Sequence, residues 1–118
     1  MKLRRVAHVN LSVDDVDRAR AFYGELLGLE PAPRPAEAGR AGCWFRLGEV
    51  ELHISEEHDA DNARSKRHVA FEVTGLDELR THLGRAGVAV DDGRQMPGMR
   101  RFFVRDPAGN RLELFEPA

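Results

Sequence analysis

The chain has 118 residues, of which 42% are apolar and 32% are charged, and its 18 basic and 20 acidic side chains leave a net charge of −2. This length and composition predict a single domain, residues 1–118, with one hydrophobic core. The balanced charge argues against a nucleic-acid partner, and no apolar run approaches the roughly 20 residues needed to cross a bilayer.

The single cysteine, Cys43, excludes an intrachain disulfide and predicts a cytoplasmic location. The first residues are basic, but His8 and Asn10 follow where a signal peptide needs an apolar core. Cys43 falls in a predicted strand, and we expect it to be a small buried side chain rather than a reactive thiol.

The first elements are a strand and a helix. Alternating apolar residues predict a strand over residues 5–13, with the apolar side chains on one face and His8, Asn10 and Ser12 on the other. We expect Asp14 to cap the following helix, with Asp17 three residues later resembling a capping box. Gly28 is placed to end that helix.

Three further segments complete the first half of the chain. Prolines at positions 31, 33 and 35 predict an extended or edge segment. Residues 42–47 and 49–55 then predict a hairpin that turns near Gly48. The polar, acidic residues 56–66 predict a solvated linker.

The second half of the chain predicts a similar order of elements. The expected strands and helix cover residues 68–73, 76–86 (the helix), 88–91, 101–105 and 111–116. Residues 106–110, Asp-Pro-Ala-Gly-Asn, have the composition of a turn.

The sequence repeats itself at an interval of 60 residues. His8 and His68 are 60 apart, and so are His53 and Glu113, and the residues around each pair match as well. A fixed internal period predicts a duplicated architecture. We expect two βαβββ modules, approximately residues 4–55 and 67–117, joined by the linker.

These four side chains are candidate metal ligands. In each strand the candidate lies opposite an apolar row that must pack on the helices, so all four are expected on the concave side of the sheets. Three imidazoles and one carboxylate suit a divalent zinc, iron, manganese, nickel or cobalt ion. Glu51 has the same facing as His53 and competes with it, although the 60-residue offset favours His53.

The chain resembles the vicinal oxygen chelate superfamily, which includes glyoxalase I, fosfomycin-resistance proteins, bleomycin-resistance proteins and extradiol dioxygenases. The matching segments are His-Val-Asn-Leu-Ser-Val at 8–13, Arg-Ala-Arg-Ala-Phe-Tyr at 18–23, Leu-Leu-Gly-Leu at 26–29, His-Val-Ala-Phe at 68–71 and Asp-Pro-Ala-Gly-Asn-Arg-Leu-Glu-Leu at 106–114. The last of these is the most specific, and together the segments span nearly the whole chain.

The resemblance implies an α+β fold in which two βαβββ modules form a curved mixed sheet around a central metal cavity. Carried over residue by residue, it implies metal ligation by His8, His68 and Glu113, with His53 in the remaining position. Homodimers that exchange modules are common in the family, so the ligands of one ion can come from both subunits.

The resemblance also implies an activity on a small molecule with two vicinal oxygens. The metal would act as a Lewis acid that stabilises an enediolate or an alkoxide, as in a glyoxalase-like lyase, an isomerase or a thiol transferase. Glu113, alone or with Glu51, is the candidate proton shuttle. Candidate substrate-binding residues are Trp44, Arg101, Phe103 and Phe115. With Arg101, the arginines at 46, 100 and 105 are candidates for a cationic pocket that binds an anion.

Three alternatives remain at this stage. A bleomycin-resistance type of protein would bind a small molecule or antibiotic without catalysis. A ring-cleaving dioxygenase would use two histidines and one carboxylate on iron, although such enzymes usually carry more modules. A structural zinc site would be closed by four protein ligands and leave no open coordination position.

Overall fold

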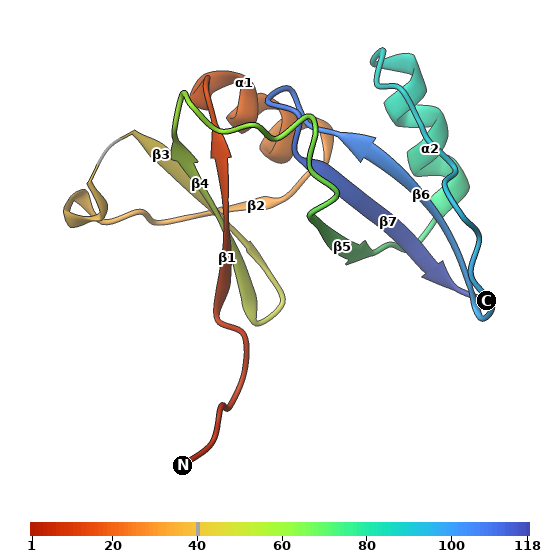
Figure 1. The fold of residues 1–118 in the computed structure, drawn as a ribbon, viewed down its shortest axis with the longest axis horizontal. Coiled ribbons are helices and arrows are strands. Elements are labelled where there is room, and N and C mark those ends of the chain that lie inside the picture. Colours follow the sequence, from red (N-terminus) through yellow and green to blue (C-terminus); the bar gives the residue numbers. More distant parts are fainter. Residues whose placement is uncertain (40) are drawn as a thin grey trace. The chain divides into compact units, whose positions relative to one another are not determined.

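The computed structural model describes residues 1–39 and 41–118, and Figure 1 shows its helices and strands. The described chain divides into two compact units, Met1–Ala60 (unit one) and Asp61–Ala118 (unit two). Each unit combines helical structure with a small sheet of its own. The protein is therefore of the α+β class, as the sequence predicted.

Unit one contains a four-stranded sheet in the order β1-β4-β3-β2. Its elements are β1 (His8–Val13), α1 (Val16–Arg20), the π-helical turn η1 (Ala21–Leu26), β2 (Glu30–Ala32), the 3₁₀ turn η2 (Ala36–Ala38), β3 (Gly42–Leu47) and β4 (Val50–Glu56). β1 runs parallel to β4, while β3 is antiparallel to both β4 and β2. The first repeat therefore has the expected βαβββ order.

The helix of unit one begins one residue later than predicted. Asp15, not Asp14, is the N-cap, and its carboxylate accepts a hydrogen bond from the Arg18 N–H at 3.1 Å. Asp17 lies inside the first turn and pairs with Arg20 at 2.8 Å, so the predicted capping box is wrong. Two consecutive aspartates offer the same capping chemistry, and the local sequence could not separate them.

The core of unit one lies between the helix and the sheet. α1 packs against β3 and β4, and Tyr23 and Phe45 are almost completely buried. A Cβ at Gly24 would lie 3.3 Å from the Phe45 ring, so a glycine allows the helix to approach the sheet closely. Cys43 is buried, and burial raises the pKa of its thiol, as expected for a core side chain rather than a nucleophile.

Unit two contains a three-stranded sheet in the order β5-β7-β6. Its elements are β5 (His68–Glu72), α2 (Leu76–Arg85), β6 (Met99–Arg105) and β7 (Arg111–Pro117). β5 is parallel to β7, β6 is antiparallel to β7, and α2 packs against β7. The buried apolar side chains are Leu76, Leu83, Phe102, Phe103, Val104, Leu112 and Leu114.

The strand predicted over residues 88–91 is reduced to one bridge, between Asp91 and Phe103. The Asp91 carboxylate accepts a hydrogen bond from the Gly93 N–H at 2.9 Å, and Gly93 has a positive φ of 61°. This turn follows the bridge and limits pairing beyond Asp91, while residues 88–90, before the bridge, do not pair in a strand.

The turn before β7 is built around a buried carboxylate. Asp106 is 4% exposed, and its Oδ1 accepts hydrogen bonds from the N–H groups of Ala108 at 2.9 Å and Asn110 at 2.8 Å. Gly109 has a φ of +90°, and a Cβ there would lie 3.0 Å from the Ala63 nitrogen. Only glycine meets both demands, and the turn fixes where β7 begins.

The parallel strand pairs of the two units share one register, and Figure 1 shows β1 beside β4 and β5 beside β7. The matched positions are His8–Glu51 and Asn10–His53 in β1–β4, and His68–Arg111 and Ala70–Glu113 in β5–β7. Each residue of the second set lies 60 positions after its counterpart in the first. The sequence repeat is therefore also a repeat of strand pairing.

Candidate metal centre

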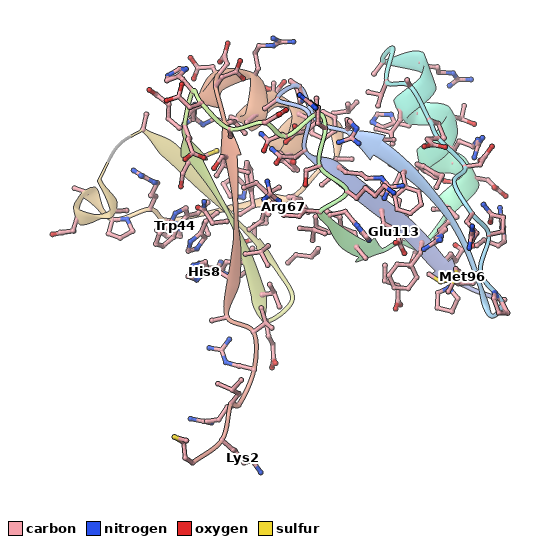
Figure 2. All side chains as sticks on the ribbon, viewed as in Figure 1. Lys2, His8, Trp44, Arg67, Met96 and Glu113 are labelled. Carbon is pink, nitrogen blue, oxygen red and sulfur yellow. The ribbon has the colours of Figure 1, made fainter. Side chains whose placement is uncertain are left out.

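The two predicted donors of unit two, His68 and Glu113, lie in contact. Nε2 of His68 is 3.3 Å from Oε1 of Glu113, across the neighbouring strands β5 and β7. Figure 2 labels Glu113 on β7. Its side chain is 7% exposed and that of His68 is 35% exposed. Imidazole nitrogen and carboxylate oxygen are donors that divalent transition metals accept.

The hydrogen bond made by Nδ1 of His68 determines which of its two ring nitrogens carries the proton. Nδ1 lies 3.0 Å from the Lys66 carbonyl oxygen, which can only accept, so Nδ1 carries a proton. In a neutral His68 the Nε2 lone pair then faces a Glu113 oxygen that also only accepts. A proton or a metal cation at Nε2 removes this conflict. A carbonyl that orients Nδ1 is also a common outer partner of metal-bound histidine.

Arg101 holds Glu113 on the other side of the carboxylate. Its Nη1 donates to Glu113 Oε1 at 3.2 Å, and its Nε and Nη2 donate to the Arg94 carbonyl at 3.0 and 2.6 Å. The Arg101 side chain is only 15% exposed. All three of its nitrogens are engaged within unit two, where Arg101 supports Glu113. Its predicted contact with substrate stays a prediction.

The two predicted histidine donors of unit one belong to a stack of three rings. The centroid of the His53 ring lies 3.7 Å from that of Trp44 and 4.0 Å from that of His8, with interplanar angles of 2° and 15°. The rings come from β4, β3 and β1, and Figure 2 labels Trp44 and His8. His53 is 8% exposed whereas His8 is exposed. His8 and His53 therefore share one face of their sheet, as the alternation predicted.

The stacked rings of His8 and His53 do not converge on one point. A metal ion lies in the plane of each imidazole that binds it, at about 2.0–2.1 Å for zinc, and two near-parallel planes with centroids 4.0 Å apart share no such position. Within residues 1–39 and 41–118, no group of three or more His, Cys, Asp or Glu side chains is arranged to hold a metal ion. The donor types fit a metal, but the rings of His8 and His53 must leave their stack before they can share an ion.

Glu51 and His53, the two candidates for the fourth ligand, are themselves in contact. Glu51 Oε1 lies 2.9 Å from His53 Nε2, while its Oε2 is 3.9 Å from Arg46. The Glu51 side chain is 31% exposed. Both donors therefore reach the same point on the face, and both remain candidates.

The other arginines considered for an anion pocket are paired within the protein. Arg100 contacts two carboxylates, those of Asp77 and Glu116. Arg105 donates to three main-chain carbonyl oxygens, those of Asn62 and Ser65 before β5 and that of Gly109 in the turn before β7. Arg46 lies at 3.9–4.0 Å from two glutamates. These contacts favour structural roles.

The Phe103 ring lies among three basic side chains. It is 4% exposed, the His68 ring meets it edge-on at 5.6 Å, and the guanidinium carbons of Arg101 and Arg111 lie 4.9 and 3.8 Å from its centroid. Sequence reasoning missed Arg111. The signal was present, because Arg111 precedes Glu113 by two residues in one strand and so shares its face.

The remaining candidate wall residues, Trp44 and Phe115, are both partly buried. Trp44 is covered on one side by His53, and Phe115 lies opposite Arg101 in the β6–β7 ladder. Their roles as walls of a substrate site stay predictions.

Comparison with known proteins identifies the family. Residues 5–114 match the model of the Glyoxalase/Bleomycin resistance protein/Dioxygenase superfamily. The chain belongs to this superfamily. The resemblance seen in the sequence is thus confirmed, and the fold is glyoxalase-like. No described helix is long and apolar enough to span a membrane.

Individual members of the superfamily are similar over nearly the whole chain. A solved glyoxalase family protein from Bacillus anthracis is 38% identical, with a TM-score of 0.90 and coverage of 100% of this chain and 98% of that one. Lactoylglutathione lyase from Agrobacterium tumefaciens is 27% identical, with a TM-score of 0.77 over 98% and 96% of the two chains. Glutathione transferase FosA of Serratia marcescens is 28% identical over 95% of this chain and 80% of its own length.

Proposed function

We propose that this protein is a metal-dependent enzyme that acts on a small substrate with two vicinal oxygens. The observation that carries the proposal is the contact between His68 Nε2 and Glu113 Oε1, with the opposite nitrogen of His68 held by the Lys66 carbonyl. Such a pair is prepared for a cation. The similarity to a lyase and to a glutathione transferase supports an activity of the lyase, isomerase or thiol-transferase type.

The proposed ligands are His8, His53, His68 and Glu113, binding one divalent zinc, iron, manganese, nickel or cobalt ion. When bound, this ion would supply Lewis-acid stabilisation of the negative charge that develops on the substrate oxygens. His68 and Glu113 are already in contact, whereas His8 and His53 have to leave their stack. Metal binding is therefore expected to reorganise unit one more than unit two.

Glu51 and Glu113 are the proposed proton carriers, and their surroundings differ. Oε1 of Glu113 already has two partners, His68 and Arg101, and its side chain is 7% exposed. Glu51 is 31% exposed and its nearest guanidinium is 3.9 Å away. A proton carrier must reach both the substrate and a place to release the proton, and Glu51 has the greater freedom to do so.

Metal content tests the proposal directly. Protein purified without a histidine tag and incubated with zinc, manganese, nickel or anaerobic iron(II) is expected to hold about one ion per chain, and His68→Ala is expected to lose it. His58→Ala is the matched control, because His58 is exposed and its side chain contacts Glu56, which is outside the proposed ligand set. Stoichiometric metal retained in His68→Ala would contradict the assignment.

A second candidate function is a non-catalytic binding protein for a flat aromatic molecule. The Trp44–His53–His8 stack favours it, because parallel rings already occupy one face and another ring could extend the stack from the exposed His8. Ligand binding that is unchanged by a chelator would support this function over the enzyme.

We also propose that the protein works as a cytoplasmic homodimer. Dimers are frequent in the superfamily, and the single cysteine supports a reducing compartment. Sedimentation of the purified protein tests whether it is a dimer.

A further inference from the structure

We propose that Arg111 binds an anionic group of the substrate, a carboxylate or a phosphonate, beside His68 and Glu113. The inference rests on the proposed function and narrows its substrate class to small oxyanions. Arg111 has no assigned role in the metal set or in the proton transfer. Its surroundings in unit two carry the argument.

The Arg111 guanidinium has no acidic partner among the residues that the structure describes. It takes part in none of their ion pairs, and its contact is with the Phe103 ring, 3.8 Å from the centroid. The residue is nevertheless half-buried. Partial burial of an unpaired charge is costly, and an anion from solution would offset that cost.

The charges near Arg111 leave a net positive balance. Glu113 is the buried carboxylate of this cluster, and Arg101 already hydrogen-bonds it. Arg111 is therefore in excess, and a bound divalent ion would add two further positive charges. An anionic substrate group would complement this excess, and a neutral one would not.

Position also favours Arg111 over the other arginines of unit two. It lies directly opposite His68 in the β5–β7 ladder and two residues before Glu113 on β7. Its side chain and the His68 ring both contact Phe103. A substrate anion held there would lie next to the donors proposed for the metal.

The repeat gives an independent comparison. The position equivalent to Arg111 in unit one is Glu51, since His8 faces Glu51 as His68 faces Arg111. Glu51 contacts the histidine on its own strand. The equivalent positions therefore carry opposite charges. Glu51 suits a proton carrier in unit one, and Arg111 suits an anion-binding residue in unit two.

The contact with Phe103 suits bidentate recognition. A guanidinium lying over a ring keeps its N–H edge available in a fixed plane, and two parallel N–H groups match the oxygens of a carboxylate or phosphonate. A lysine would keep the charge but lose this geometry. Arg111→Lys and Arg111→Gln therefore separate the two contributions.

Anion titration tests the proposal. Lactate, methylphosphonate and the neutral 1,2-propanediol would be titrated by NMR into the metal-free and the zinc-loaded protein. We expect Arg111→Gln to weaken binding of at least one anion by about 10- to 100-fold, with Arg111→Lys between it and the unchanged protein. Arg85→Gln, which removes an exposed arginine at the end of α2, is the matched control and is expected to bind as the unchanged protein does. The anion that responds identifies the group.

Two results would overturn the inference. One is a folded Arg111→Gln variant that binds both anions as tightly as the unchanged protein, with folding checked by thermal melting. The other is an unchanged protein that binds neither anion more tightly than 1,2-propanediol. Metal content is measured on the same samples, so failure to bind zinc would count against the proposed function while the metal-free titration still decides the role of Arg111.

Discussion

His53 and Glu113 occupy equivalent positions in the two repeats, although one is an imidazole and the other a carboxylate. His53 faces Asn10 in the β1–β4 ladder, and Glu113 faces Ala70, 60 residues further on, in the β5–β7 ladder. Both are buried. Each takes part in an imidazole–carboxylate contact within its own unit: His53 supplies the imidazole to Glu51, and Glu113 supplies the carboxylate to His68.

The ring stack of unit one predicts an optical response to metal. Zinc binding should draw His53 away from Trp44, because the stacked rings of His8 and His53 cannot share an ion. An imidazole in contact with an indole quenches its emission, so Trp44 fluorescence is expected to increase on adding zinc. His53→Ala should lack the response and His58→Ala should retain it. Unchanged emission while one equivalent of zinc binds would contradict the predicted movement of His53 away from Trp44.

Mixing two inactive variants tests whether one ion takes ligands from two subunits. His8→Ala removes a donor of unit one, and His68→Ala removes a donor of unit two. If the ligands of one ion come from both subunits, one of the two sites in a mixed dimer has all its ligands. The mixed dimer is then expected to bind about half as much metal as a dimer of the unchanged protein. If each chain supplies a whole set, mixing restores no metal. Metal analysis after joint refolding of the two variants distinguishes the outcomes.

Much of the fold could be predicted because the repeat is written in the sequence. The 60-residue offset predicted the equivalence of the strand pairs, and the ladders share that offset. The predictions that were wrong concerned the position of a helix cap and the extent of one strand, where neighbouring residues indicate the same structure equally well. Asp14 and Asp15 can both cap a helix, and the apolar residues 88–90 suggested a strand that pairs only through the bridge at Asp91.

The candidate site was less predictable, because facing along a strand does not fix side-chain torsions. Alternation put His8 and His53 on one face, but it could not foresee that their rings stack rather than converge. Arg101 is predicted to meet substrate, and the structure shows it bound to Glu113 and to the Arg94 carbonyl. The strand pattern did not indicate the second contact, because Arg94 lies in a loop.

Glu113 is predicted to stabilise unit two in the absence of metal. Glu113→Ala would leave the 15%-exposed Arg101 without its carboxylate, and we expect a loss of about 3 kcal/mol in the free energy of unfolding. Glu113→Gln retains an oxygen acceptor and should lose less. Urea unfolding of both metal-free variants measures this. Equal stability of the two would mean that the Arg101 contact contributes little.

The Arg80–Asp92 ion pair predicts a pH dependence at acid pH. Nη1 of Arg80 donates to Asp92 at 2.6 Å, and this hydrogen bond lowers the pKa of Asp92 below the ordinary value of about 3.9. The stabilisation is therefore complete above about pH 4 and is lost as the pH falls through the lowered pKa. A carboxyl NMR titration should show the Asp92 midpoint rising in Arg80→Gln. A midpoint that does not move would contradict the pairing.

Two glycine substitutions are predicted to change stability in opposite directions. At Gly42 on β3 a Cβ would lie 2.3 Å from the Ile54 carbonyl oxygen on the paired strand, so Gly42→Ala must push β3 and β4 apart. We expect it to lower the free energy of unfolding by about 1–3 kcal/mol. Gly84 lies inside α2 with nothing within 4 Å of an added Cβ. Gly84→Ala should therefore raise the free energy of unfolding by about 0.5–1 kcal/mol, because alanine favours the helix.

Thermal and urea unfolding of these two variants, compared with the unchanged protein, check both signs. Each substitution adds the same methyl group. The difference between the two changes in the free energy of unfolding therefore reports the different surroundings of the added carbon. A Gly42→Ala variant as stable as the unchanged protein would mean that the β3–β4 ladder can widen at Ile54 without losing its pairing. The same widening would shift the Trp44–His53 pairing next to it, and Trp44 emission would report that shift.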